Sequence, residues 1–310
     1  MRASRGVVLN GTGGVWTVRT PDGEQHDASI RGRLKQDGVG LKLAVGDDVT
    51  VERAGNAGAW AITTIHPRRG VLARRAPGRA PGERIVAANV DQVLVVFSLA
   101  NPEPHVRMLD RFLVIAEGND IPARIVLNKI DLPGGVARAR EFSSVYEEAG
   151  YHVHGTSVKA GVGLDELRAL LAGRTTALTG PSGVGKSSLV NALFPGLELR
   201  TAEISPSVNK GRHTTVGAML VPIPDARGGF VVDTPGLREV GMWGLPPRNL
   251  DVCFPEFREF IGSCRFDDCS HEHEPKCAVR AAVETGKISQ ARYDSYVKLH
   301  AELVEAEETW

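Results

Sequence analysis

The sequence predicts an α/β protein in which a parallel sheet stands between a small N-terminal β-barrel and a C-terminal helical segment rich in cysteine and histidine. Three observations support this fold class. Between residues 93 and 193, apolar strands alternate with helical segments, a pattern typical of a parallel sheet covered on both faces. Residues 1–72 contain only short alternating segments separated by turn residues. From Pro246 onward, a cysteine and histidine cluster precedes two helical segments.

The composition excludes a membrane-spanning or disordered chain. The 310 residues are enough for two or three domains, and 42% apolar with 24% charged residues suits packed cores. The strongest apolar run, residues 93–100, is too short to span a bilayer, and the start of the chain has no signal-peptide pattern. We therefore expect a cytoplasmic protein without membrane contact. We also expect a monomer, because no long exposed apolar stripe demands a partner.

The N-terminal part, residues 1–75, is expected to be a barrel of the OB type, although a β-sandwich or an SH3-like barrel would fit the same strands. The clearest strands cover residues 15–18, 49–51 and 60–65. Residues 76–85 follow as a linker with two Pro-Gly turns. Residues 1–84 carry 14 basic and 8 acidic side chains, and six arginines lie between Arg68 and Arg84. This arginine run fits either a solvated linker or contacts with nucleic-acid phosphates.

The central domain, residues 86–245, is predicted from four strands and four helices. We expect the strands at residues 93–97, 124–127, 176–179 and 229–232, and the helices at residues 106–117, 138–149, 164–171 and 186–193. Residues 246–310 form a third domain, with helices near residues 276–285 and 289–308. The second of these helices carries an apolar stripe.

The segment from Gly180 to Ser187 matches the phosphate-binding loop G-x-x-x-x-G-K-[ST], with a strand before it and a helix after it. In such a loop, backbone N–H groups surround the phosphates at a helix N-terminus. Lys186 is expected to reach the β and γ phosphates, and the Ser187 hydroxyl to bind Mg²⁺. The predicted nucleotide contacts of this loop are Gly180, Ser182, Gly183, Val184, Gly185, Lys186, Ser187 and Ser188.

A guanine-specific element follows the strand at residues 124–127, at the strand end where α/β proteins bind ligands. It consists of Asn128, Lys129 and Asp131. The Asp131 carboxylate can accept hydrogen bonds from guanine N1 and N2, whereas adenine offers no such pair. Lys129 can cover the base, and Asn128 can tie this segment to the phosphate loop. The sequence therefore predicts GTP and GDP as ligands.

A further base contact is predicted at Ser157 and Val158, which resemble the S-A-x element whose backbone contacts guanine O6. Val158 stands where alanine is usual. A simple capping role for Thr156 and Ser157 fits these residues nearly as well.

The remaining phosphate elements follow the loop. Asp233, directly after the strand at residues 229–232, is expected to hold Mg²⁺, and the Gly236 N–H to contact the γ-phosphate. In the segment 211–215, Thr215 is the expected switch residue and third Mg²⁺ ligand, with Thr214 as the alternative. The position after Gly236 holds Leu237, which cannot orient water as the glutamine usual there does.

Hydrolysis therefore needs a polar group from elsewhere, and His213 is the nearest candidate. His213 can equally be an exposed loop histidine.

The cysteine cluster has the spacing Cys264-x4-Cys269-x-His271-x5-Cys277. Three thiolates and one imidazole form a closed tetrahedral site, which indicates one structural Zn²⁺. His273 is an alternative ligand, and the role of Cys253 stays open. The acidic residues around the cluster leave too few apolar side chains for this segment to fold without metal.

The order of these elements along the chain is unusual. In most GTPases the phosphate loop comes first and the base-recognition elements last. Here the elements occur at positions 128, 156, 180, 215 and 233, so the base-recognition elements come first. This order indicates a circular permutation, which a domain tolerates when its natural termini lie close together.

The permuted order, the barrel, the Gly-Arg-His-Thr-Thr segment and the Cys3His spacing together resemble the bacterial family of small ribosomal subunit biogenesis GTPases, RsgA or YjeQ. The resemblance covers almost the whole chain. It implies a circularly permuted P-loop GTPase that is stimulated by the 30S subunit and acts late in its maturation. It also implies that the barrel and the zinc domain contact 16S rRNA, and that His213 positions the attacking water while Lys186 and Thr215 complete the catalytic set.

Two other functions are compatible with the motifs. In one, GTP gates binding to a partner and hydrolysis is incidental. In the other, the phosphate loop serves a small-molecule kinase, but the guanine-specific element argues against the ATP use that this requires.

Overall fold

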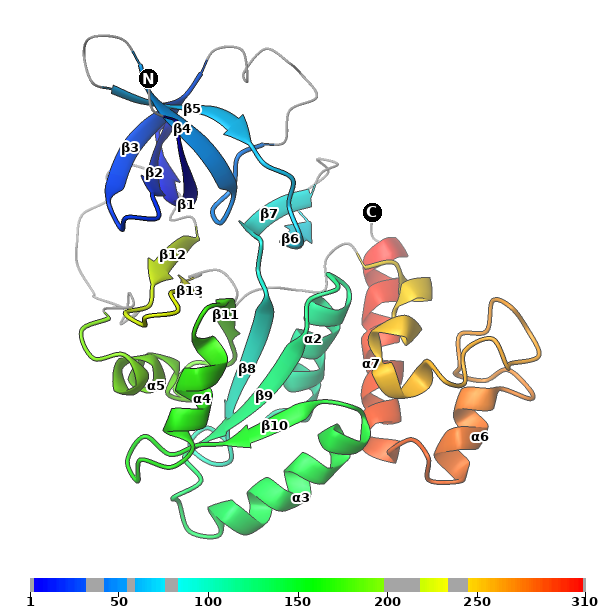
Figure 1. Cartoon of the computed structure of the whole chain (residues 1–310). Helices are drawn as coiled ribbons and strands as arrows, with labels where there is room; N and C mark the ends of the chain where they lie inside the picture. The colour runs from blue at the N-terminus through cyan, green and yellow to red at the C-terminus, as the bar shows by residue number, and fades with distance from the viewer. Residues whose placement is uncertain are drawn as a thin grey trace, which may run out of the picture.

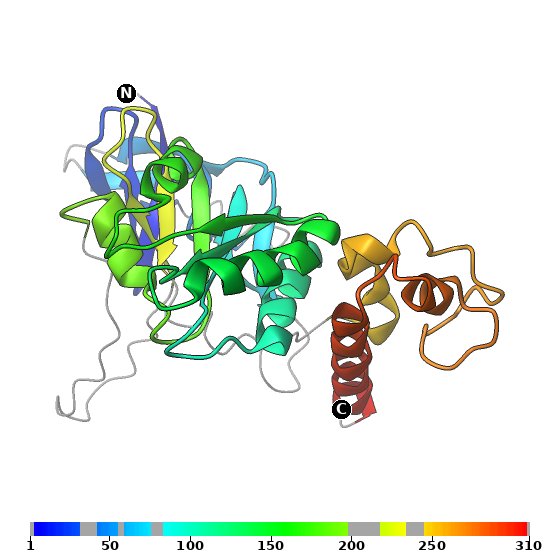
Figure 2. The same cartoon turned by 90° about the horizontal axis from the view of Figure 1, so that it is seen from below.

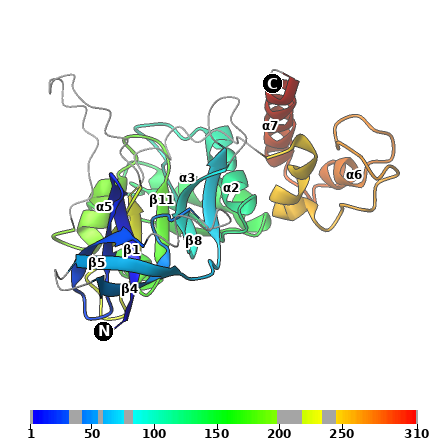
Figure 3. The ribbon, with the colours of Figure 1, turned by 90° about the horizontal axis from the view of Figure 1, so that it is seen from above.

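The structure, a computed structural model, describes residues 3–31, 42–54, 59–75, 83–197, 218–233 and 245–308. Three parts follow one another along the chain: a β-barrel, an α/β domain and a helical C-terminal domain (Figure 1). The barrel and the C-terminal domain lie at opposite ends of the molecule, with the α/β domain between them, as views from below and above show (Figures 2 and 3).

The barrel is closed and has five strands in the order β1-β2-β3-β5-β4. Their bounds are β1 Ser4–Thr12, β2 Val15–Arg19, β3 Gln25–Ile30, β4 Asp48–Ala54 and β5 Ala59–Ile65. Strands β3 and β5 pair in parallel and the other neighbours pair antiparallel. Valine and isoleucine side chains fill the interior. The predicted barrel is confirmed, and the sequence missed β1 because a bulge between Val8 and Asn10 interrupts its alternation.

A small hairpin joins the barrel to the α/β domain. It consists of β6 (Val71–Arg75) and β7 (Glu83–Ala88), so residues 83–85 of the predicted linker belong to a strand. The predicted domain boundaries stay a prediction. Before this hairpin, Arg68 donates to both oxygens of Asp47, at 2.6 and 2.8 Å, and the two side chains are 6% and 0% exposed. Arg68 is therefore a structural residue, unlike a solvated or phosphate-binding arginine.

The central sheet has six strands in the order β10-β9-β8-β11-β13-β12. Five are parallel: β8 Gln92–Ser98, β9 Ala123–Asn128, β10 His152–Gly155, β11 Thr175–Thr179 and β13 Phe230–Asp233. The edge strand β12 (Met219–Pro222) runs antiparallel to β13. Its four residues, the last a proline, are too short a signal for the sequence to predict it.

Helices cover both faces of this sheet. Helices α2 (Val106–Glu117) and α3 (Gly135–Glu148) pack on one face, and α4 (Leu164–Leu171) and α5 (Lys186–Leu193) pack on the other. The bounds of α2, α4 and α5 agree with the prediction, whereas α3 begins three residues earlier and ends one residue earlier. The two apolar cores alternate along the strands, so that Val95 faces the α2 side and Val96 the α4 side.

The C-terminal domain starts with three short 3₁₀ turns, η2 (Pro247–Asn249), η3 (Asp251–Cys253) and η4 (Pro255–Phe257). Helices α6 (Ala278–Glu284) and α7 (Gln290–Glu308) follow. Its apolar core extends onto α2 through Val114. None of the helices in the described ranges has the length and apolar character needed to cross a membrane.

A buried ion network fixes the C-terminal domain to the α/β domain. Arg292 of α7 donates to Asp110 of α2 at 2.5 Å and to Glu256 at 2.6 Å. All three side chains are almost fully buried, and the Arg292 guanidinium lies 4.5 Å from the ring centre of Phe254. The Tyr146 hydroxyl donates to the same Asp110 oxygen at 3.0 Å. One guanidinium thus bridges two carboxylates, and within the described residues Oδ2 of Asp110 has no hydrogen-bond partner. These polar contacts hold α7 against α2 together with the apolar ones.

Candidate functional site

Elements far apart in the chain meet where the parallel strands of the central sheet end, at their carboxyl termini. The parallel register places Ser98 of β8 beside Asn128 of β9, and Thr179 of β11 beside Val95 of β8. Strand β13 pairs with β11 and ends at Asp233. The base-recognition element after β9, the phosphate loop after β11 and Asp233 therefore emerge at the carboxyl ends of neighbouring strands, where α/β proteins bind ligands.

The phosphate loop is built from close backbone approaches that require glycine. A Cβ atom on Gly180, whose φ is +130°, would lie 2.0 Å from the carbonyl oxygen of Val96. A Cβ atom on Gly185, with φ of +96°, would lie 2.5 Å from Nδ2 of Asn128. Helix α5 begins directly after Gly185, so its first backbone N–H groups are available to a phosphate.

The ammonium group of Lys186 lies over this loop. Its Nζ donates to the carbonyl oxygens of Gly180 and Pro181, each at 2.6 Å. Ser187 is half-buried in the first turn of α5, and Ser182 and Ser188 are exposed. The loop thus presents a cation, three hydroxyl groups and helix-terminal N–H donors, a set that suits phosphate and Mg²⁺.

Asn128 joins the base-recognition element to the phosphate loop. Its side chain is buried, and Nδ2 donates to the carbonyl oxygen of Val184 at 2.9 Å. Its Oδ1 accepts a hydrogen bond from the Thr156 hydroxyl at 3.3 Å. The link between Asn128 and the phosphate loop that the sequence suggested is thus present. Thr156, which directly precedes the predicted base contacts Ser157 and Val158, also bonds to Asn128.

Lys129 bridges two segments of the site. The residue has φ of +64°, and Nζ donates to the carbonyl oxygens of Gly183, at 2.8 Å, and Asn101, at 2.5 Å. Asn101 lies between β8 and α2, and the sequence analysis did not assign it to the site. The only available signal was its place after a predicted strand, because a main-chain acceptor has no residue-type signature.

Asp131 is oriented by Ser157. The Ser157 hydroxyl is fully buried and donates to Oδ1 of Asp131 at 2.6 Å, while Ala160 N–H donates to the same hydroxyl at 3.0 Å. The carboxylate itself is exposed and available to a base. The sequence analysis assigned a backbone contact to Ser157 but not this side-chain role. The half-buried side chain of Val158 packs on the core under α4.

The predicted switch residues are only partly described. Asp233 pairs with Met219 across the β12–β13 hairpin, so the chain enters and leaves this hairpin at the same end. His213, Thr214, Thr215, Gly236 and Leu237 lie outside the described residues. Their predicted roles stay predictions.

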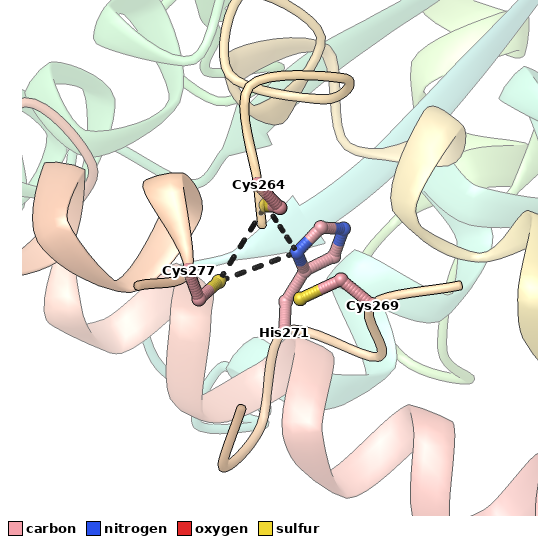
Figure 4. A group of neighbouring side chains, drawn as sticks. All are labelled: Cys264, Cys269, His271 and Cys277. Atoms are coloured by element: carbon pink, nitrogen blue, oxygen red, sulfur yellow. Dashed lines mark hydrogen bonds between the residues drawn. The ribbon is translucent and has the colours of Figure 1, made fainter. Parts of the chain in front are cut away.

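The Cys3His cluster is assembled in the C-terminal domain (Figure 4). One possible ligand atom from each of Cys264, Cys269, His271 and Cys277 lies within 4.8 Å of the others. Nδ1 of His271 faces the sulfur atoms of Cys264 and Cys277 at 3.5 and 3.4 Å. The donor set and its spacing fit a tetrahedral Zn²⁺. Within the described residues, His273 is not part of this cluster; it is exposed.

Neighbouring groups hold the cluster in place. Nε2 of His271 lies 3.4 Å from a carboxylate oxygen of Asp251, an arrangement that fixes the imidazole so that Nδ1 faces the thiols. The Tyr293 hydroxyl donates to the carbonyl oxygen of His271 at 2.8 Å. Sequence spacing gave no signal for Asp251, because it lies 20 residues before its partner.

Glu274 organises the loop between the ligands. Its carboxylate accepts hydrogen bonds from the Ser270 hydroxyl, at 2.6 Å, and from three backbone N–H groups. Burial acts to raise the pKa of Glu274, but these hydrogen bonds outweigh it and lower the pKa to about 2. Cys253 lies outside the cluster in the apolar core, where burial raises the pKa of its thiol to about 12.

Comparisons with known proteins agree with this architecture. The family model described as RsgA GTPase matches residues 65–243. The small ribosomal subunit biogenesis GTPase RsgA of Gemmatimonas aurantiaca is 61% identical, over 97% of this chain and 98% of its own. The corresponding protein of Shewanella oneidensis is 40% identical, over 97% and 84%.

Two solved structures share the fold. The crystal structure of YjeQ from Thermotoga maritima has a TM-score of 0.82 at 35% identity, covering 98% of this chain and 99% of its own. YloQ, described as a circularly permuted GTPase, has a TM-score of 0.76 at 30% identity, covering 98% and 96%. The similarity therefore extends over the barrel, the α/β domain and the C-terminal domain.

Proposed function

This chain belongs to the RsgA GTPase family, and from that membership we propose that it hydrolyses GTP to GDP and phosphate on the 30S ribosomal subunit, late in the maturation of that subunit. Its closely similar relatives are named for small ribosomal subunit biogenesis. The proposal places the chain in the cytoplasm as a monomer whose hydrolysis is accelerated by the subunit.

The GTP assignment rests on the contacts that join the base-recognition element to the phosphate loop and orient Asp131. Asn128 reaches the phosphate loop at Val184, Lys129 reaches it at Gly183, and Ser157 holds the Asp131 carboxylate. A guanine base seated on Asp131 would therefore have its phosphates directed toward Gly180–Ser187. A carboxylate aimed at N1 and N2 rejects adenine, since adenine would leave it without donors.

Hydrolysis requires the γ-phosphate to be held and a water to be oriented. Lys186 is proposed to move from the carbonyl oxygens of its own loop to the β and γ phosphates. Ser187, Asp233 and Thr215 are proposed to hold Mg²⁺, which when bound neutralises charge on the phosphates. His213 is proposed to position the water in place of the glutamine absent at Leu237.

The C-terminal cluster is proposed to hold one structural Zn²⁺. The three thiols and Nδ1 of His271 supply a closed set of four ligands, which leaves no position for a substrate. The surrounding loop is rich in acidic residues and poor in apolar ones, so metal binding would supply much of its folding free energy.

The proposed RNA partner is 16S rRNA, contacted by the barrel and by the C-terminal domain. The excess of basic residues before position 85 supports the first contact. Arg68 is excluded from it by its buried pair with Asp47, so the contact has to come from other basic residues of this region.

GTP turnover measured with and without purified 30S subunits, at low and high salt, tests the proposal. We expect strong stimulation by 30S but not by 50S subunits or free RNA, and a loss of stimulation as salt rises. Equal turnover in all cases would refute the ribosomal role and leave a GTPase with another partner.

A further inference from the structure

A groove of about 740 Å³ lies between the start of α2 and the first half of α7, outside both the nucleotide site and the cysteine cluster. From α2 it is lined by the segment from Pro104 to Met108 and by Arg111. From α7 it is lined by Ala291, Asp294, Ser295 and Lys298. The two helices belong to different domains and lie side by side in Figure 1, so the groove exists only while the domains are docked.

The α2 wall ends in an uncapped helix N-terminus. His105 occupies the N-cap position without a side-chain capping hydrogen bond, and the first turn contains no acidic residue. The first intrahelical hydrogen bonds are donated by the backbone N–H groups of Met108 and Leu109. The backbone N–H groups of Val106 and Arg107, which precede them, have no intrahelical acceptor. Such an end has free N–H donors and partial positive charge, both of which favour an anion.

The α7 wall independently provides an unpaired donor. Ser295 lines the groove and is 5% exposed, and its hydroxyl oxygen has no hydrogen-bond partner in the described part of the chain. Buried hydroxyl groups are nearly always paired in folded proteins. The oxygen is not accessible in this structure, so a ligand in the groove could accept its hydrogen bond only after rotation about χ1 turns the hydroxyl toward the groove.

The charges of the groove favour a phosphate. Lys298 is exposed and, within the described ranges, has no ion-pair partner. Arg107 and Arg111 share Glu302, and the Arg107 pair is long, at 3.7 Å. The one acidic lining residue, Asp294, already accepts a hydrogen bond from Gln290 at 2.7 Å. The groove therefore combines one unpaired cation, two shared cations, amide donors and a hydroxyl.

We propose that this groove binds a backbone phosphate of the small-subunit RNA. Because residues of both domains line the groove, this contact forms only while the two domains are docked. The inference rests on the proposed ribosomal function and adds a contact site to it. Because the donors address phosphate and not base edges, the contact carries no sequence preference. An RNA strand held here would touch the GTPase domain and the C-terminal domain at the same time.

The test measures the affinity of the full-length chain, loaded with a non-hydrolysable GTP analogue, for purified 30S subunits between 50 and 300 mM salt, and repeats it with Lys298→Ala and Ser295→Ala. We expect the slope of log K against log salt to become shallower by about 1 in Lys298→Ala, because one phosphate contact is lost. Ser295→Ala is expected to weaken binding about fivefold at unchanged slope, since only a neutral donor is removed. Arg140→Ala, which removes an exposed cation from α3 outside the groove, serves as the control and should bind like the wild type.

Each other outcome overturns the inference. If both groove variants bind like the wild type while the wild type binds and is stimulated, the groove is not a contact and the proposed function stands. If Lys298→Ala weakens binding without changing the slope, the groove contacts a protein surface and not RNA. If the wild type itself shows no affinity for the subunit, the proposed function fails and this inference fails with it.

Discussion

Replacing Arg292 with methionine tests whether the buried ion network holds the C-terminal domain on the GTPase domain. Methionine fills much of the same space without charge, so Asp110 and Glu256 keep their positions but lose their shared cation. Asp110 is 0% exposed and Glu256 is 6% exposed at the side chain, so water cannot replace that cation without opening the interface.

The expected cost follows from this burial. Removing one partner of a buried pair costs about 3–5 kcal/mol, because uncompensated charge stays behind, and here both carboxylates lose their cation. The Tyr146 hydroxyl still donates to Asp110 at 3.0 Å, which favours the lower end of this range. A loss of about 3 kcal/mol corresponds to an increase of about 150-fold in the population with the interface open.

Amide hydrogen exchange of the GDP-bound chain, read by mass spectrometry, measures this population locally. Peptides from α7 and from residues 255–257 are expected to exchange about 100-fold faster, while peptides from β8 and β9 keep their protection. Adding Asp110→Asn and Glu256→Gln to the variant should recover much of the loss, since no buried charge is then unpaired. Arg248→Met, at an exposed position, is the matched control. An increase below about fivefold, or one spread evenly over the sheet, would refute the reasoning.

Four further changes have defined outcomes. Asp131→Asn is expected to shift preference from GTP toward xanthosine triphosphate in competition binding, because an amide can donate to the oxygen that replaces the guanine amino group. His213→Ala is expected to lower subunit-stimulated turnover about 100-fold or more at unchanged GTP affinity, as measured by single-turnover assays and nucleotide binding. Chelation is expected to release one zinc per chain and expose three reactive thiols at pH 8, because the ligand loop loses its structure without metal, while Cys253, buried in the apolar core, stays unmodified. In urea unfolding of the chain with saturating Zn²⁺ present, Glu274→Gln is expected to lose less stability than the wild type between pH 5 and pH 3.

The sign of the last expectation follows from the lowered pKa of Glu274. The folded pKa of about 2 lies below the ordinary value of about 4.3, so the stabilisation is complete above about pH 5 and is lost as pH falls toward 2. Glutamine cannot titrate, and all other groups are common to both chains. Equal acid sensitivity of the two chains would show that the Glu274 hydrogen bonds do not contribute. Four reactive thiols after chelation would contradict the burial of Cys253, and an unchanged nucleotide preference would place base recognition away from Asp131.

Local patterns allowed much of the fold to be predicted. The helices α2, α4 and α5 have strong apolar periodicity or follow a glycine-rich loop, and their predicted bounds agree with the structure. The barrel was identified from its turns, although two strands were missed. A bulge interrupts the alternation of β1, and the half-exposed polar residues of β3 give little apolar signal. The phosphate loop was predicted because its residues are adjacent in sequence and act as one unit.

The contacts that position the site residues could not be predicted. Asp251 reaches His271 across 20 residues, and Lys129 reaches a main-chain oxygen of Asn101 across 28 residues, so neither contact has a spacing or a residue type that marks it. The same holds for Arg68, whose place in an arginine-rich stretch pointed to the surface while Asp47 draws it inside. Long-range pairing, and not composition, decides the environment of each of these residues.

The placement of the barrel and the C-terminal domain at opposite ends of one body has a consequence for how tightly the chain is held. If both ends contact the small subunit as proposed, binding of one end raises the effective concentration of the target of the other, and two weak contacts can raise overall affinity by about 10²–10⁴ over either one. The gain disappears when either contact opens. Under the proposed function, a rearrangement of the α/β domain that opens one of the two contacts would therefore convert long residence into rapid departure.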